Sequence, residues 1–226
     1  MSDKITTKKL PIYGKDTDPS QGVSNEYKTS QYAIRQPCLM YVSAVRNSGK
    51  SFAVSKLVAQ AQKEKTFDRI YMITPTFQSN KSYFGKMIDE DDVFEPTKDS
   101  IQKVIERVDG ERDEFEDYLR KEKLYKEFIQ ILKSKREFSD GEIIKFEELG
   151  FLDDELDRPK WKNKVVRPPT SAVILDDVLG SSLLKSHKLE QLFCTNRHIA
   201  PLNEPHSNRS ACGLAIYILV QSYTSR

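Results

Sequence analysis

Residues 44–51, A-V-R-N-S-G-K-S, combine a lysine, a hydroxyl and a glycine-containing turn in an order suited to binding phosphate groups. They overlap the end of an apolar run, Leu39 to Val45, and precede a helix-like stretch, Phe52 to Ala61. A strand, a tight turn and a helix in this order form a P-loop, whose backbone N–H groups point at phosphate. Lys50 would reach the β- and γ-phosphates, and the Ser51 hydroxyl would coordinate Mg²⁺. The residues expected to surround the phosphates are Arg46, Asn47, Ser48, Gly49, Lys50, Ser51 and Phe52.

The first position of this motif departs from the usual pattern, because Ala44 stands where a P-loop has a glycine. Alanine is the smallest replacement, but its Cβ removes easy access to positive φ. The alternative interpretation is an ordinary glycine-containing turn between a strand and a helix. The core S-G-K-S, with a strand before it and a helix after it, favours the P-loop.

Two adjacent carboxylates follow a second apolar run, as in a Walker B strand. The expected strand, Ala172 to Leu175, is followed directly by Asp176 and Asp177. Parallel α/β sheets bind ligands at the carboxyl ends of their strands, so these carboxylates would lie beside the P-loop. Asp176 would hold Mg²⁺ through water, and Asp177 would polarise the attacking water of a hydrolysis reaction. The alternative is a pair of acids that open a turn after a strand.

A third apolar run, Leu214 to Val220, ends in the polar side chain of Gln221. At the carboxyl end of a strand beside the P-loop, this amide can sense the γ-phosphate and position water. Capping of the strand end is the alternative role. The three runs are apolar almost throughout, which indicates parallel strands buried on both faces. We therefore expect the three strands to be adjacent in one sheet.

Length and composition fit one intracellular α/β domain. A chain of 226 residues can bury a sizeable core, and a formal net charge of +2 neither requires nor excludes nucleic acid. Cys38, Cys194 and Cys212 lack the spacing of a disulfide or metal framework, and the three histidines are not spaced as zinc ligands. With no signal peptide or membrane-length apolar run visible, we expect a soluble protein without stable membrane insertion.

The remaining segments suggest the organisation of the chain. Residues 1–30 are polar and are predicted to be a poorly ordered lead-in, and residues 31–226 to form the P-loop domain, whose C-terminal part is short or truncated. The further expected elements are a strand from Ile70 to Thr74, loop and short helix over 76–98, a helix from Leu183 to His198 and a loop from Ala200 to Ser210.

Residues 99–150 are predicted to be a helical insertion. Apolar side chains recur there at helical spacing, and three pairs of opposite charge are spaced i,i+4. We expect the aromatic stripe to pack in a core rather than to stack on nucleic-acid bases. The stripe is Phe115, Tyr118, Leu119, Tyr125, Phe128, Ile129 and Leu132, and the pairs are Glu116–Arg120, Asp117–Lys121 and Glu122–Lys126.

A basic run follows the insertion. Five cations surround one aromatic side chain, so the run would suit either a nucleic-acid backbone or an exposed loop. It contains Arg158, Lys160, Trp161, Lys162, Lys164 and Arg167.

Three blocks together resemble the FtsK–HerA superfamily, specifically the genome-packaging ATPases of poxviruses and other large DNA viruses. They are P-C-L-M-Y-V-S-A-V-R-N-S-G-K-S, V-I-L-D-D and N-R-H…I-L-V-Q-S-Y, and the resemblance covers about residues 34–225. It implies a RecA-like (ASCE) α/β fold, with a central, mainly parallel sheet flanked by helices and a helical insertion. It also implies a homo-oligomeric ring, hexamer or pentamer, that uses ATP and Mg²⁺ to drive double-stranded DNA into a viral capsid or portal vertex. The implied location is the host cytoplasm or a viral factory, or the virion itself.

The resemblance transfers roles residue by residue. Lys50 and Ser51 match the phosphate and Mg²⁺ positions, Asp176 and Asp177 match the acidic pair, and Gln221 matches the polar sensor. The pair formed by Arg197 and His198 matches an Arg-His pair before the sensor strand. Because the region after Q-S-Y is largely absent, Arg197 or Arg226 is left as the arginine finger. The implied catalytic set is Asp177, Lys50, Gln221 and Arg197.

Other functions stay open. One alternative is a different nucleic-acid ATPase, a helicase or a terminase motor. Another is a nucleotide-dependent scaffold without turnover, which the replacement at Ala44 motivates. A GTPase is disfavoured because N-K-S-Y and N-K-V-V lack the acid that reads guanine. A small-molecule kinase is disfavoured because the Asp-Asp and Gln strand ends suit activation of water.

Overall fold

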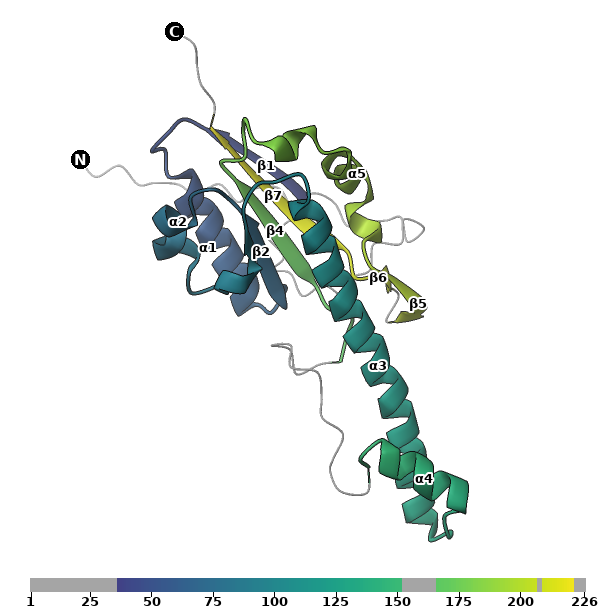
Figure 1. The fold of residues 1–226 in the computed structure, drawn as a ribbon. Coiled ribbons are helices and arrows are strands. Elements are labelled where there is room, and N and C mark those ends of the chain that lie inside the picture. Colours follow the sequence, from purple (N-terminus) through teal and green to yellow (C-terminus); the bar gives the residue numbers. More distant parts are fainter. Residues whose placement is uncertain (1–35, 152–165, 207–208, 222–226) are drawn as a thin grey trace, which may run out of the picture.

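The computed structural model of the chain describes residues 36–151, 166–206 and 209–221. The predicted lead-in and most of the basic run lie outside these residues, so the domain boundary near residue 31 stays a prediction. Figure 1 shows one central sheet with helices on both faces, and a long helix that extends well beyond the sheet. Within the described ranges, no helix is both long and apolar enough to span a membrane.

Five parallel strands form the central sheet, in the order β1-β7-β4-β2-β3. Their bounds are Leu39–Ala44 (β1), Arg69–Ile73 (β2), Val93–Phe94 (β3), Ser171–Asp176 (β4) and Leu214–Gln221 (β7). β7 lies between β1 and β4, with Gln221 opposite Ala44 and Leu219 opposite Asp176. The three strands that end in the candidate chemistry are therefore adjacent, as predicted. The short edge strand β3 was not predicted.

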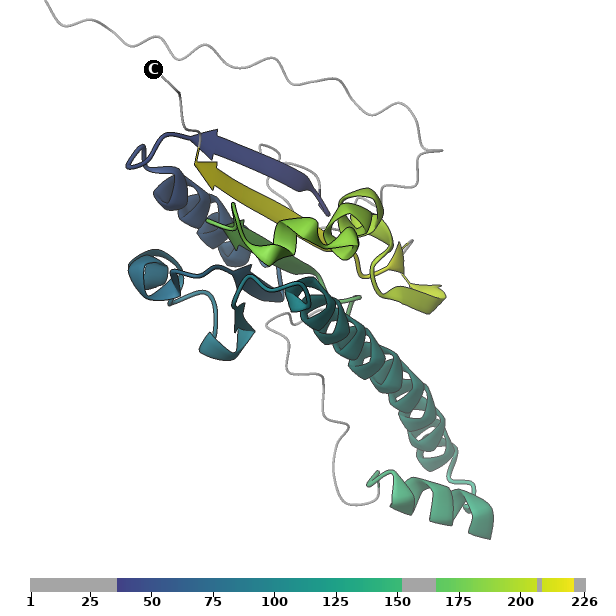
Figure 2. The same ribbon diagram turned by 45° about the horizontal axis from the view of Figure 1, so that its top comes forward.

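Strands β4 and β7 are buried on both faces, as their continuous apolar sequences predict, and β2, predicted only as a strand, is buried in the same way. One face of the sheet packs against α1 (Lys50–Lys63) and α2 (Phe77–Phe84), and the other against α3 (Ser100–Ser134) and α5 (His187–Thr195) (Figures 1 and 2). Along β4, Val173 and Leu175 belong to the core under α3 and α5, whereas Ile174 belongs to the core under α1. This arrangement confirms the predicted α/β fold.

Strand β1 differs from the prediction of burial on both faces. Met40 and Val42 pack towards α1, but Leu39 and Tyr41 on the opposite face are 48% and 63% exposed. In the part of the chain that the structure describes, β1 pairs with β7 alone, and the core under α3 and α5 contains no β1 residue. An apolar run alone cannot distinguish an edge strand from a central one.

Residues 99–150 are mostly helical, as predicted, and contain α3 and α4 (Asp140–Glu148) with a short link between them. Their aromatic side chains pack in cores, although Leu132 at the end of the stripe is exposed. Part of α3 crosses the sheet, and the far end of the helix carries α4 away from it (Figures 1 and 2). The buried aromatic residues at this far end are Phe128, Phe146 and Phe151.

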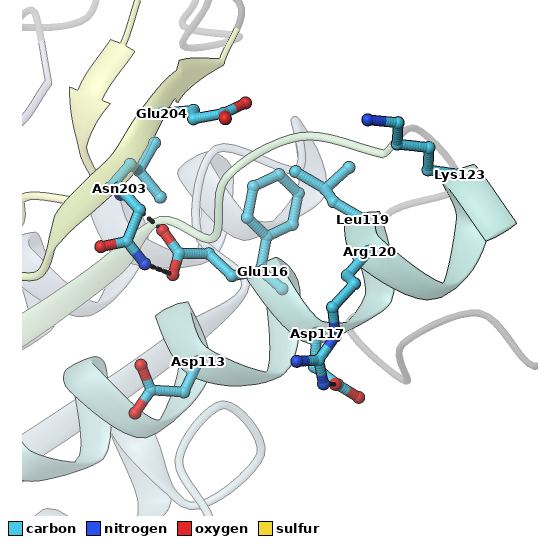
Figure 3. Close-up of a pocket in the computed structure, with 10 residues that line it drawn as sticks. Asp113, Glu116, Asp117, Leu119, Arg120, Lys123, Asn203 and Glu204 are labelled. Atoms are coloured by element: carbon cyan, nitrogen blue, oxygen red, sulfur yellow. Dashed lines mark hydrogen bonds and ion pairs between the residues drawn. The ribbon is translucent and has the colours of Figure 1, made fainter. Parts of the chain in front are cut away.

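Two of the three predicted i,i+4 ion pairs are present, Asp117 with Lys121 and Glu122 with Lys126. The third is wrong. The Glu116 carboxylate instead accepts hydrogen bonds from Asn203, through its backbone N–H at 2.6 Å and its side-chain amide (Figure 3). A tertiary contact has replaced the local pair.

The segment before β7 corrects two predictions. The single helix expected from Leu183 to His198 is three short elements, namely a 3₁₀ turn at Ser182–Lys185, α5, and a second 3₁₀ turn at Asn196–His198. Ser186 between the first two has an extended backbone, which interrupts the helix. The loop expected from Ala200 to Ser210 contains the antiparallel strands β5 (Pro201–His206) and β6 (Arg209–Ala211). The prolines and polar residues of this segment do not give the apolar alternation that is typical of a strand. The contact of Asn203 with α3 stabilises strand β5 instead.

A buried polar cluster joins α3 to the amino ends of β2 and β4. The Tyr71 hydroxyl donates to Glu111 Oε1 and the Ser171 hydroxyl to Glu111 Oε2, both at 2.6 Å. Arg69 Nη1 lies 3.8 Å from the same carboxylate. Burial raises the pKa of Glu111 above its ordinary value, while these hydrogen bonds and Arg69 act in the opposite direction.

Replacement of Glu111 by Gln should therefore change how stability depends on pH. A folded-state pKa above the unfolded one means that the folded wild type binds the extra proton more tightly, so its stability falls as pH rises above about 4. The stability of Glu111→Gln does not fall in this way, because the variant has no carboxyl group to titrate at this position. Urea denaturation at several pH values should show that the free energy of unfolding of the variant increases relative to that of the wild type as pH increases. A difference that does not change with pH would contradict the assignment.

Candidate nucleotide-binding site

The turn between β1 and α1 has the backbone that a phosphate-binding loop needs. Asn47 and Gly49 have positive φ values of 62° and 84°. Glycine adopts such values without strain, and asparagine tolerates them better than most residues. Ala44 belongs to β1 and is not among the residues of positive φ. The alanine that replaces the usual first glycine is therefore not strained. Its presence at position 44 is no argument against a P-loop.

The start of α1 presents backbone donors to open space. The helix begins at Lys50, two residues before the predicted start, and its first hydrogen bond runs from Ala53 N–H to Gly49 O at 2.8 Å. The N–H groups of Lys50, Ser51 and Phe52 have no acceptor among the described residues. A Cβ built on Gly49 would meet no atom within 4 Å. Free donors and the positive end of a helix favour an anion here.

The Walker B carboxylate meets the P-loop lysine beneath this turn. Lys50 Nζ lies 3.6 Å from Asp176 Oδ1, and both side chains are largely buried. The second oxygen, Asp176 Oδ2, accepts a hydrogen bond of 2.7 Å from Asn80 Nδ2. Burial raises the pKa of Asp176, the neighbouring Asp177 acts in the same direction, and Lys50 and Asn80 oppose the shift. Both carboxylate oxygens are thus held in fixed directions.

The second carboxylate turns towards the neighbouring strand. Asp177 follows β4 with a φ of 54°, a left-handed conformation that aspartate tolerates better than most residues. Gln221 Nε2, at the end of β7, donates to Asp177 Oδ1 at 3.3 Å. The pair can orient a water molecule between them and a phosphate bound at the helix N-terminus.

One cavity of about 330 Å³ contains nearly all of the predicted site residues. Arg197 is absent from its lining and is exposed in the 3₁₀ turn at Asn196–His198. Ser51 and Asp176 both line it, and their hydroxyl and carboxylate oxygens are ligands that suit Mg²⁺. The predicted residues that line the cavity are Arg46, Asn47, Ser48, Gly49, Lys50, Ser51, Phe52, Asp176, Asp177 and Gln221.

The contribution of α2 to this cavity was not predicted from the sequence. Thr76, Ser79, Asn80 and Tyr83 line it from the segment that follows β2. The available signal was the position of β2, because polar residues after any parallel strand of the sheet lie at the ligand-binding edge. We had predicted that segment only as loop and short helix.

Asn80→Ala should weaken the dependence of the site on Mg²⁺. The change removes the hydrogen bond that, with the ion pair to Lys50, fixes the Asp176 carboxylate, and a hydrogen bond to a charged group contributes about 1.5–3 kcal/mol. We expect the Mg²⁺ concentration for half-maximal nucleotide binding to rise about tenfold or more. Lys81→Ala, on the same helix and paired with Glu90, is the matched control. Equal Mg²⁺ titrations for the two variants would contradict a role for Asn80.

A larger cavity of about 550 Å³ lies away from the P-loop, between α3 and β5 (Figure 3). Most of the charged side chains around it are acidic, and none of the predicted site residues lines it. It has no helix N-terminus directed into it and no cluster of cations, so it offers no phosphate site. Its labelled side chains are Asp113, Glu116, Asp117, Leu119, Arg120, Lys123, Asn203 and Glu204.

Arg167 is the one member of the basic run that lies in the described residues. Its guanidinium lies 3.1 Å from Asp68 Oδ2 and donates to the carbonyls of Lys65 and Pro168. These contacts tie the start of β4 to the turn before β2, at the amino ends of the strands. Arg167 therefore has a structural role at the edge opposite the cavity.

A P-loop after β1, an acidic pair at the end of β4 and an intervening strand in a parallel sheet are the arrangement of a RecA-like P-loop fold. No protein-family model matches the chain, and no curated protein matches it. Among solved structures the chain is similar to the monomer form of the pCW3 conjugation coupling protein TcpA with ATPγS, at 16% identity and a TM-score of 0.39. The match covers 94% of this chain and 52% of that one, so the chain spans about half the length of the coupling protein.

Proposed function

We propose that the chain hydrolyses ATP. The observation that carries the proposal is the convergence of Lys50, Asp176, Asp177 and Gln221 on one cavity at the N-terminus of α1. Cation, acidic pair and polar amide lie at or just after the carboxyl ends of three adjacent strands, and free backbone donors face the same space. Structural ion pairs explain a lysine near an aspartate, but they do not explain this whole set.

Each side chain has a distinct task in this proposal. The free N–H groups and Lys50 bind the phosphates, and the lysine stabilises the charge that develops on the γ-phosphate. Asp177, oriented by Gln221, accepts the proton of the attacking water. Ser51 and Asp176 would hold Mg²⁺, which neutralises charge on the β- and γ-phosphate oxygens when bound. Arg197 is proposed to act from a neighbouring subunit, because it lies outside its own cavity.

We further propose that hydrolysis drives movement on double-stranded DNA during packaging of a viral genome. The three blocks that resemble the FtsK–HerA packaging ATPases support this function. The near-zero net charge of +2 supports a ring, because one subunit supplies few cations for phosphate contacts. The proposed partners are DNA, further copies of the chain and a capsid or portal vertex. The proposed location is the host cytoplasm, a viral factory or the virion.

Triplex displacement tests the motor function. A third strand annealed to duplex DNA should be released by the purified protein in the presence of Mg·ATP, and Lys50→Ala should release none. Release of the third strand with the duplex intact supports a translocase. Separation of the duplex itself would identify a helicase instead, and ATP binding without release or turnover would identify a scaffold.

DNA binding should depend on both assembly and salt. We expect weak binding by the monomer and tighter binding by the assembled ring, with an affinity that falls steeply as salt increases. Analytical ultracentrifugation with fluorescent duplex DNA, at two or more salt concentrations, measures both quantities. Tight binding by the monomer that salt does not change would contradict the proposal.

A further inference from the structure

Two exposed aromatic side chains stand at the mouth of the P-loop cavity. Phe52 is 52% and Tyr83 43% exposed, and both line the cavity. Their ring centroids are 6.3 Å apart in an edge-to-face arrangement, with an angle of 73° between the planes. Neither ring belongs to a core cluster of the described residues. Large apolar side chains in this position lack the packing that would explain them.

The positions of the two rings in their helices place them next to the phosphate cradle. Phe52 is the third residue of α1, and its backbone N–H is one of the free donors. Tyr83 lies on α2, three residues after Asn80, which contacts Asp176. Three residues of helix advance about 4.5 Å, or nearly one turn. The cavity thus has a polar side at the strand ends and an aromatic side on the two helices.

Lys56 completes the aromatic side. It lies one helical turn beyond Phe52, and its Nζ is 5.3 Å from the centroid of the Phe52 ring. The cation is exposed and lies over the ring without filling the cavity. A flat, electron-rich ligand can stack on an aromatic ring of this kind and gain further from a nearby cation.

We propose that Phe52 and Tyr83 hold the purine base of the nucleoside triphosphate by stacking. The inference rests on the proposed nucleotide-binding function and adds the basis of its substrate selection. A stacking surface distinguishes bases by the area of their ring systems rather than by the hydrogen-bonding groups along their edges. Purine nucleotides should therefore bind more tightly than pyrimidine nucleotides, and the preference should depend on the ring of Phe52.

Inorganic tripolyphosphate separates the base from the phosphates. Calorimetric titration of the full-length protein with ATP, CTP and tripolyphosphate, each with Mg²⁺, measures the two parts of the site. For Phe52→Ala we expect about 5- to 150-fold weaker binding of ATP, from the stacking energy of one base. Binding of tripolyphosphate should be unchanged, which also shows that the variant is folded. The preference for ATP over CTP should largely disappear.

Conservative and control variants sharpen the test. Phe52→Trp and Tyr83→Phe keep a ring and should keep the affinity for ATP, whereas Tyr83→Ala should lose part of it. Tyr41→Ala removes an aromatic ring that is also exposed but lies outside the cavity, so it should change nothing.

The outcomes distinguish this inference from the function on which it rests. If the wild type binds neither ATP nor tripolyphosphate, the nucleotide-binding function fails, and the inference with it. If the wild type binds both but Phe52→Ala binds ATP normally, only the stacking inference is overturned. An equal loss of ATP and tripolyphosphate in that variant also overturns it, because the residue would then act on the phosphates.

Discussion

Lys50→Ala should abolish detectable ATP hydrolysis and weaken nucleotide binding. Among the described lysines and arginines, Lys50 and Arg46 line the cavity, and Lys50 is the one that contacts Asp176. Loss of a positive charge directed at the transferring phosphate costs about 10²–10³-fold in turnover for one donor. The change also leaves the buried Asp176 without its cation, which weakens the metal site further. The measurement is steady-state phosphate release at saturating ATP.

The control for this variant is Lys63→Ala, an exposed lysine in the last turn of the same helix. It should hydrolyse ATP at the wild-type rate. Unchanged turnover in Lys50→Ala would refute the P-loop assignment, whatever the result for the control.

Asp177→Asn should bind Mg·ATP normally and hydrolyse it about 10²–10⁴-fold more slowly, the usual contribution of a general base. The substitution is nearly isosteric, and asparagine also tolerates the left-handed backbone at this position. Its side-chain oxygen can still accept the hydrogen bond from Gln221. Because the carboxylate acts mainly in the transition state, kcat should fall with little change in affinity.

Two further variants define the specificity of this effect. Asp176→Asn should impair Mg²⁺-dependent binding as well as turnover, because that carboxylate faces Lys50 rather than Gln221. Asp91→Asn, at an exposed carboxylate in the turn at Glu90–Asp92, should behave as wild type. Wild-type turnover by Asp177→Asn would move the catalytic role to another carboxylate.

The sequence predicted those parts of the site that depend on local order. The local order of residues determines where a lysine lies after a glycine-containing turn, and where carboxylates lie after an apolar run. Strands β4 and β7 were predictable because burial on both faces leaves continuous apolar residues. The helical insertion was predictable from its 3.6-residue spacing.

The parts that were missed depend on contacts between distant segments. Asn80 lies 96 residues from Asp176 in the chain, and nothing near it in the sequence marks the pairing. Strand β5 contains two prolines, yet its Asn203 docks on Glu116, 87 residues away. The sequence likewise does not indicate the left-handed backbone at Asp177, although this conformation directs the side chain to Gln221.

The rate of phosphate release from Mg·ATP by the purified full-length protein tests the central claim most directly. We predict measurable turnover that requires Mg²⁺, rises when linear duplex DNA is added and is lost in Lys50→Ala. ATP binding without any phosphate release, under conditions where the ring has assembled on DNA, would contradict the claim that Asp177 and Gln221 activate water in this cavity.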